Sequence, residues 1–361
     1  MNNNLIWLPE TARTEDITDE VYFQREPWKY YISNSKLNLV DPSTGGNIKL
    51  FEKSFKSEKR SKALQVGTIT HSLLLQADSY GVSDIIRPSG KLGDIVYDIF
   101  KLRSQDNISI QEALDIAIRY SNYYNGRPTK GILKKMIREG LPYYMHLRLY
   151  RERDFILNSE EVNIVLGCLD SLKCNSNAME ILFPADKNIL RFNEMAIACD
   201  VKLDNTIYTL KIKIDNWNLN LKTGEATLND LKTTGSGLQN FVNGYWEFYP
   251  GENDDVRIFH PGSFQKYKYY RQLAMYSKVL EMFILNKYGF IPKININIVA
   301  VETREPYWSD VFSFGVYQND IFSARQLAVG LDEMKNLLYI LKDNNYVSGV
   351  EGFNRQSCAF I

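Results

Sequence analysis

The sequence has few cysteines, no excess charge of either sign and no long hydrophobic run. Its 361 residues include four cysteines with no close CxxC pair, which disfavours both a disulfide framework and a zinc knuckle: Cys168, Cys174, Cys199 and Cys358. No apolar run approaches the ~18 residues that a membrane-spanning helix needs. The first residues, MNNNLIWLPE, lack the basic and then apolar plan of a secretory signal. We therefore expect a cytoplasmic protein with no membrane partner.

The chain carries 43 Lys+Arg and 43 Asp+Glu, so its formal net charge of zero gives no general indication of nucleic-acid binding. The charges are nevertheless unevenly distributed. Residues 1–26 are acidic, with six acids against two arginines, whereas residues 49–62, 127–153 and 266–278 are basic. These basic runs are either solvated helix faces or strips that contact phosphates. The content of 5 Trp, 23 Tyr and 18 Phe excludes disorder for most of the chain.

The length suggests two domains, or one large core with an insertion. A helix is predicted to begin near residue 32, with a serine as its cap. Apolar periodicity predicts further helices over residues 62–76, 266–287 and 319–343, and a strand over residues 294–301. Helices flanking strands predict an α/β fold with a mixed central β-sheet and a mostly helical insertion. We divide the chain into an acidic, irregular lead-in (residues 1–30), N-terminal helices (31–79), a helical insertion or lid (80–180), the main core (181–345) and a tail (346–361).

Two strands joined by a tight turn carry the polar residues of most interest. Apolar and polar side chains alternate up to Asp215, residues 222–225 form a turn signal, and the chain returns through residues 226–232. Such a hairpin can bring Asp215 beside Asp230, on strand faces opposite the apolar side chains. Lys232 shares the face of Asp230, because side chains two residues apart point the same way.

Two carboxylates and a backbone carbonyl make a good site for Mg²⁺, which prefers oxygen ligands and keeps some water. A metal there could activate water for attack on a phosphodiester, with Lys232 to orient or deprotonate that water. An isolated Asp-x-Lys is far more often a surface salt bridge. The preceding strand that ends in Asp215 strengthens the hypothesis of a site.

The segments IKID (residues 212–215) and DLKTT (residues 230–234) resemble the PD-(D/E)xK nuclease signature, within which the chain is most similar to phage-type RecE-like exonucleases related to the lambda exonuclease and RecB nuclease domains. Three more segments agree in order. ISNSKL (residues 32–37) resembles the serine-containing opening segment, GTITH (residues 67–71) the Gly-Thr-x-x-His helix, and YRQLAMY (residues 270–276) the Gln-x-x-x-Tyr motif. The resemblance spans roughly residues 30–285 and implies a restriction-endonuclease-like core.

The resemblance implies a role for each matching residue. Asp215 and Asp230 would be metal ligands and Lys232 the catalytic lysine, with Glu194, or alternatively Glu180, as the upstream acid. His71 would be a further ligand, unless it is a hydrogen-bonded core residue. Gln272 would hydrogen-bond a phosphate or a metal-coordinated water. Candidate DNA contacts, each with a structural alternative such as a cap, a strand end, a solvated charge or a core position, are Ser33, Ser35, Thr233, Thr234, Lys268, Arg271 and Tyr276.

The implied activity is a Mg²⁺-dependent DNA exonuclease, with Mn²⁺ able to substitute, that degrades duplex ends 5′ to 3′ in phage-type recombination or repair. The Fe–S-bearing branch of this superfamily uses four cysteines around the nuclease core. In this sequence only Cys358 follows the core, so the resemblance implies no Fe–S cluster. Expected partners are double-stranded DNA ends, a single-strand annealing protein and further copies of the chain in a ring, in the host cytoplasm if a phage encodes it. The alternatives are an endonuclease on the same core and a non-catalytic protein that binds DNA ends.

Overall fold

The computed structural model describes residues 5–15, 17–55, 62–79, 81–83, 85–105, 108–123, 130–149, 154–155, 157–249, 256–315 and 321–346. The chain forms two compact units. The core unit comprises Met1–Leu64 and Asp170–Ile361, and the inserted unit comprises Gln65–Leu169. Several predictions concern segments that lie outside the described residues, namely 56–61, 124–129, 150–153 and the tail from residue 347, with Cys358.

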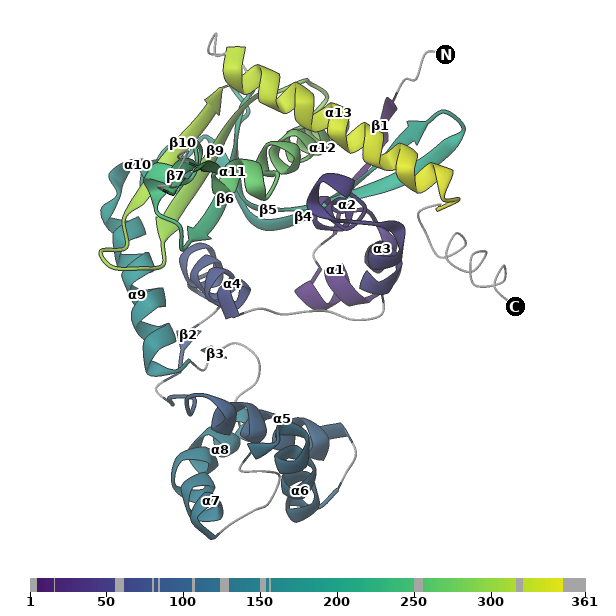
Figure 1. Ribbon diagram of the computed structural model, residues 1–361. Coiled ribbons are helices and arrows are strands. Elements are labelled where there is room, and N and C mark those ends of the chain that lie inside the picture. The colour runs from purple at the N-terminus through teal and green to yellow at the C-terminus, as the bar shows by residue number, and fades with distance from the viewer. Residues whose placement is uncertain are drawn as a thin grey trace. The chain divides into compact units, whose positions relative to one another are not determined.

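A six-stranded sheet in the order β1-β4-β5-β6-β9-β10 forms the centre of the core unit (Figure 1). Every neighbouring pair is antiparallel except β6 and β9, which are parallel, so the predicted mixed sheet is confirmed. The strands are β1 (Leu5–Thr14), β4 (Ile189–Leu203), β5 (Thr206–Asn220), β6 (Glu225–Thr234), β9 (Lys293–Glu302) and β10 (Ser309–Gly315). A separate hairpin pairs β7 (Tyr245–Tyr249) with β8 (Val256–His260).

The irregular conformation predicted for residues 1–30 is wrong. This segment contains β1, which pairs with β4 at the edge of the sheet, followed by α1 (Asp19–Gln24). The register of β1 shifts between Leu8 and Arg13, and Pro9 lies within the shift. Proline is tolerated on edge strands, where its missing N–H costs no ladder hydrogen bond. The irregular register and the proline hide the strand in the sequence.

Two long helices cover one face of the sheet. Residues of α12 (Tyr269–Tyr288), α13 (Ile321–Asp343) and strands β4, β5, β6 and β9 share one large apolar core. Figure 1 shows α12 and α13 side by side, and Gly330 permits the close approach, because a Cβ there would lie 2.7 Å from the Tyr270 carbonyl oxygen. The remaining helical elements of the core unit are η1 (Trp28–Tyr30), α2 (Asn34–Asn38), η2 (Pro42–Thr44), α3 (Ile48–Ser54), α10 (Ser176–Leu182), η5 (Leu238–Asn240) and α11 (Ser263–Lys266).

The inserted unit is mostly helical and has its own small core. Its elements are α4 (Lys62–Leu75), which begins in the core unit, β2 (Gly81–Val82), α5 (Lys91–Gln105), α6 (Ile110–Ser121), α7 (Lys130–Lys135), the π-helical turn η4 (Met136–Gly140), α8 (Leu141–Leu149), β3 (Asp154–Phe155) and α9 (Ser159–Cys174), which ends in the core unit.

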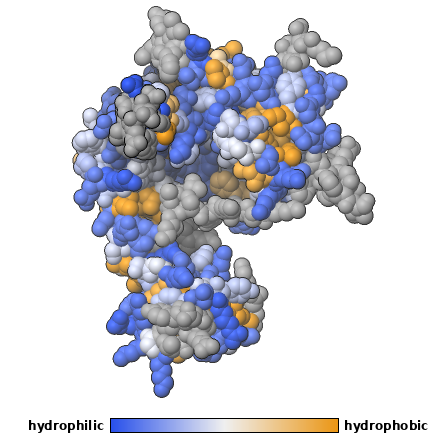
Figure 2. Space-filling model, viewed as in Figure 1, coloured by the Kyte–Doolittle hydropathy of each residue, from blue (hydrophilic) through white to orange (hydrophobic). Residues whose placement is uncertain are grey.

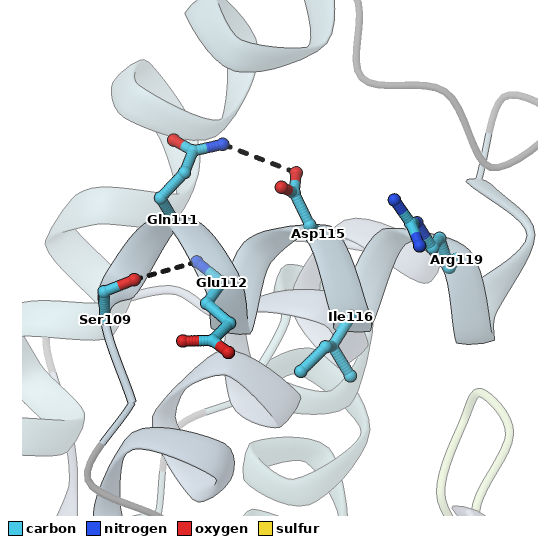
Figure 3. A pocket seen from close by; sticks show the side chains of 6 residues that line it. All are labelled: Ser109, Gln111, Glu112, Asp115, Ile116 and Arg119. Carbon is cyan, nitrogen blue, oxygen red and sulfur yellow. Dashed lines mark hydrogen bonds between the residues drawn. The ribbon is translucent and has the colours of Figure 1, made fainter.

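A surface hollow lies along α6 (Figure 3). Ser109 caps the helix by accepting from the Glu112 amide, and Gln111 donates to Asp115 one turn further on. Both contacts are local to the helix, so we read this hollow as part of the helix surface. On the face shown in Figure 2, hydrophilic residues cover most of each unit. Among the residues that the structure describes, no helix is long and apolar enough to cross a membrane.

Candidate active site

The β5–β6 hairpin places the two aspartates next to each other, as the alternation of the sequence predicts. Gly224, with φ of +70°, closes the turn, and the pairing runs from Asn220↔Glu225 to Asn216↔Asn229. Asp215 and Asp230 come directly after the last of these pairs. There the Asp215 carboxylate replaces the backbone ladder, because the Leu231 amide donates to Asp215 Oδ2 at 2.7 Å. Asp215 is thereby fixed beside the Asp-x-Lys segment of residues 230–232.

Asp230 is almost completely buried and has partners on both carboxylate oxygens. Lys232 Nζ lies 2.6 Å from Oδ2, and Gln272 Nε2 donates to Oδ1 at 3.0 Å. The expectation that Asp230 lies on the face opposite the apolar side chains is wrong. Asp230 continues the inward-facing row of Ala226 and Leu228, and so it faces α12, which carries Gln272.

The ammonium group of Lys232 is largely buried between the acids and an aromatic ring. Burial lowers its pKa, but the negative charges of Asp230 and Asp215 outweigh burial and raise the pKa above its usual range. Nζ also lies 5.2 Å from the centre of the Tyr269 ring. Lys232 is therefore a cation at neutral pH, suited to donating hydrogen bonds and stabilising negative charge rather than to accepting a proton.

Glu194 approaches Asp215 from β4, where it has the unusual φ of +52° between the pairs Asn193↔Asn216 and Met195↔Ile214. Carboxylate oxygens of Glu194 and Asp215 lie within 4.8 Å of each other. The alternative upstream acid, Glu180, is exposed on α10. The structure thus brings Glu194, and not Glu180, to Asp215.

The site contains a second lysine, Lys213, that the sequence did not identify as a site residue. Lys213 Nζ lies 2.6 Å from Glu194 Oε2 and 2.6 Å from Asp19 Oδ1. Burial lowers its pKa, but the charges of Glu194 and Asp19 raise it above the usual range. Lys213 precedes Asp215 by two residues, a spacing at which alternation along a strand predicts a shared face, and this is a usable sequence signal. Asp19 comes from α1, and nothing in the sequence predicts its approach.

Tyr276 lies one helical turn after Gln272 on α12 and is half-buried. Its pKa is raised well above the ordinary value, first by burial and then by the charges of Tyr22, Asp230 and Asp215. The hydroxyl therefore stays protonated, as a neutral hydrogen-bonding group near both aspartates. His71 lies on α4 in the inserted unit and is half-buried, and its role as a ligand stays a prediction.

Arg271 is not a DNA contact in this structure, so that prediction is wrong. Its side chain is completely buried, and the guanidinium binds Asp41 at 2.7 Å, Asn34 at 3.1 Å and Glu333 at 3.4 Å, and also the Asn38 side chain. These partners belong to α2, the following turn and α13. Arg271 therefore ties α12 to its neighbours from the core side of the helix.

The other candidate DNA contacts have structural partners, and their contact with DNA stays a prediction. Ser33 caps α2 and lies 2.9 Å from the hydroxyl of the exposed Ser35. Thr234 ends β6 and lies 3.0 Å from the Ser236 hydroxyl, next to the half-buried Thr233. Lys268 Nζ lies 3.4 Å from Glu333. In the inserted unit, Lys130, Lys134, Lys135 and Arg138 of the basic run are exposed.

No family model matches the chain, and no curated protein matches its sequence. Among solved structures, a presumed exonuclease from Eubacterium rectale is similar over 93% of this chain and 91% of its own, with 12% identity and a TM-score of 0.46. A Vibrio cholerae protein is similar over 81% of this chain and 60% of its own, with 12% identity and a TM-score of 0.18. These similarities are too low to transfer a function.

Proposed function

We propose that the chain is a metal-dependent deoxyribonuclease, and more narrowly a Mg²⁺-dependent exonuclease that degrades duplex ends 5′ to 3′ in phage-type recombination or repair. The observation that carries the proposal is a connected set of contacts: Lys232 pairs with Asp230, the Leu231 amide between them holds Asp215, and Glu194 lies beside Asp215. Duplex ends as substrate, a ring of several copies and a single-strand annealing partner follow from the resemblance to RecE-like exonucleases.

The donor set suits Mg²⁺ or Mn²⁺. Asp215, Asp230 and Glu194 offer hard carboxylate oxygens, which these cations prefer. A divalent cation at such a site supplies charge neutralisation and Lewis acidity for phosphodiester hydrolysis. The three carboxylates of Glu194, Asp215 and Asp230 outnumber the two lysines beside them, Lys213 and Lys232, which leaves negative charge for a cation to neutralise.

The residues themselves divide the remaining tasks. Lys232 holds its proton and donates to oxygens that gain negative charge as the phosphodiester is attacked. Gln272 orients Asp230 through its amide, and the Leu231 amide orients Asp215. We further propose that His71 contributes one more ligand, and that the exposed basic residues of the inserted unit contact the DNA backbone.

Linear duplex and covalently closed circular DNA, each incubated with Mg²⁺, test the proposal. Digestion of the linear form alone is expected of an exonuclease, and separate labelling of each strand gives the polarity. Nicking of circles would replace the proposal by an endonuclease. Absence of hydrolysis with every divalent metal tried would leave a protein that only binds DNA ends.

The assignment of the site is tested by Lys232→Ala, with Lys202→Ala as the matched control. Lys202 is an exposed lysine on β4 of the same sheet. Lys232→Ala should abolish cleavage and retain DNA binding. The variant loses the cation beside Asp230 but keeps the exposed basic residues proposed to contact the DNA backbone. Lys202→Ala should cleave like the parent chain. Equal cleavage by both variants would refute the assigned site.

A further inference from the structure

Each carboxylate of the candidate site is next in sequence to an asparagine. The pairs are Asn193–Glu194, Asp215–Asn216 and Asn229–Asp230, on three neighbouring strands. Asn216 and Asn229 form the last pair of the β5–β6 ladder before the aspartates. Asn216 and Asn229 are adjacent to Trp217 and Leu228, which face the core shared with α12, so these two asparagines occupy the face away from α12.

The asparagine side chains form one continuous chain of hydrogen bonds across five strands. It begins on β10 with the Ser313 hydroxyl, which donates to Asn297 Oδ1 at 2.9 Å, and Asn297 Nδ2 donates to Asn229 Oδ1 at 2.8 Å. The chain continues with Asn229 Nδ2 to Asn216 Oδ1 at 2.6 Å and ends with Asn216 Nδ2 to Asn193 Oδ1 at 2.7 Å. Asn297, Asn229 and Asn216 each accept from one neighbour and donate to the next, an arrangement in which hydrogen bonds polarise one another.

This amide ladder, defined as Asn193, Asn216, Asn229, Asn297 and Ser313, is also fixed to a helix. Asn216 and Asn229 are fully buried, and their Nδ2 atoms donate to the Leu182 and Ile181 carbonyl oxygens at 3.1 and 3.3 Å, at the C-terminal end of α10. Those carbonyls have no partner within the helix, so the ladder satisfies them. The helix end in turn holds the ladder in place.

Backbone pairing alone fixes the spacing of the carboxylates poorly. The β5–β6 ladder stops at Asn216↔Asn229, and Glu194 interrupts the β4–β5 register with its positive φ. At this same level of the sheet the amide ladder links all three strands. Mg²⁺ demands near-ideal octahedral geometry, so small displacements of its ligands cost affinity.

We propose that Asn193, Asn216 and Asn229 are positioning residues, which set the spacing of Glu194, Asp215 and Asp230 for a divalent cation. The inference rests on the proposed function. It differs from a purely structural role, in which the ladder would only attach α10 to the sheet and would leave metal affinity unchanged. Partners that orient ligands from behind typically contribute 10–100-fold to metal affinity.

Asn218 provides a matched control on the same strand and face. Its Nδ2 donates to the same Ile181 carbonyl at 2.8 Å and to Thr227 Oγ1 at 3.1 Å, and it is almost as buried as Asn216. It is not adjacent to an acid. Its Nδ2 reaches the ladder through a long contact of 3.5 Å to Asn216 Oδ1, an oxygen that also accepts from Asn229 at 2.6 Å and so keeps its ladder partner when Asn218 is lost. Loss of Asn218 should therefore weaken the attachment of α10 without moving the carboxylates.

The test is calorimetric titration of the full chain with Mn²⁺, below the melting temperature of every variant. Asn216→Ala should raise the dissociation constant for Mn²⁺ about 10–100-fold, whereas Asn218→Ala should bind Mn²⁺ as tightly as the parent chain. Asn193→Ala, at the half-buried end of the ladder, serves if Asn216→Ala does not fold, and it should weaken binding in the same direction.

Two results would overturn the inference, and they are distinguishable. If the ladder variants bind Mn²⁺ as tightly as Asn218→Ala while the parent chain binds it, the ladder is only structural and the proposed function stands. If the parent chain binds no Mn²⁺ at all, the proposed metal site fails and the inference fails with it.

Discussion

Replacing Arg271 by methionine should strongly destabilise the core unit and leave DNA affinity unchanged. The guanidinium is completely buried and binds Asp41, Glu333, Asn34 and Asn38, so its loss leaves buried polar groups without their cation. Removing one partner of a buried ion pair costs about 3–5 kcal/mol. At about 2–4 °C per kcal/mol for a domain of this order of size, the melting temperature should fall by roughly 6–20 °C.

Lys268→Met is the matched control, because Lys268 binds the same Glu333 from a partly exposed position. A pair of that kind contributes about 0–1 kcal/mol. Thermal unfolding, followed by circular dichroism, gives the two shifts, and a fluorescent duplex gives the DNA affinity of each folded variant. Equal melting temperatures together with weaker DNA binding by Arg271→Met would show that Arg271 is a phosphate contact and that our structural reading is wrong.

Three further predictions concern the site and its surroundings. Gln272→Leu should slow single-turnover cleavage by roughly tenfold or more, because Asp230 loses its amide donor; an unchanged rate would contradict that role. Chelation by EDTA should stop cleavage but leave the circular dichroism spectrum folded, since lysine ammonium groups already neutralise two of the acids; unfolding would show the metal to be structural. Burial alone would raise the pKa of Asp41, but hydrogen bonds from Ser43 and Arg271 hold it below its usual value. The stability that these contacts contribute is therefore present at pH 5 and is lost as the pH falls through the folded-state pKa. Asp41→Asn should therefore lose less melting temperature between pH 5 and pH 3 than the parent chain; an equal loss would show that Asp41 does not contribute.

Local patterns predicted the elements that carry the site. Strict alternation up to Asp215, followed by a turn signal at Gly224, specifies a hairpin in which only one register buries the apolar row. The serine before α2 is a cap by local chemistry, and Ser33 indeed accepts from the Lys36 amide. These features depend on residues close in sequence, so the sequence alone reveals them.

Contacts between distant residues explain what the sequence did not reveal. From the sequence alone, Arg271 is interpreted as a solvated cation. In the structure it is buried and pairs with Asp41 and Glu333, which are distant from it in the sequence. Lys213 is one of several polar residues on its strand, and its pairing with Asp19 depends on the position of α1, which the sequence does not reveal. The same holds for the amide ladder, whose members are unremarkable asparagines until the strand order aligns them.

Diffraction from crystals soaked in Mn²⁺, with anomalous differences recorded, tests the central claim most directly. An anomalous peak is expected between Glu194, Asp215 and Asp230, about 2.1 Å from their carboxylate oxygens, and the same map would show whether His71 reaches the cation. Crystals that bind Mn²⁺ elsewhere, or that bind none while Lys232 stays on Asp230 and Lys213 on Glu194, would contradict it.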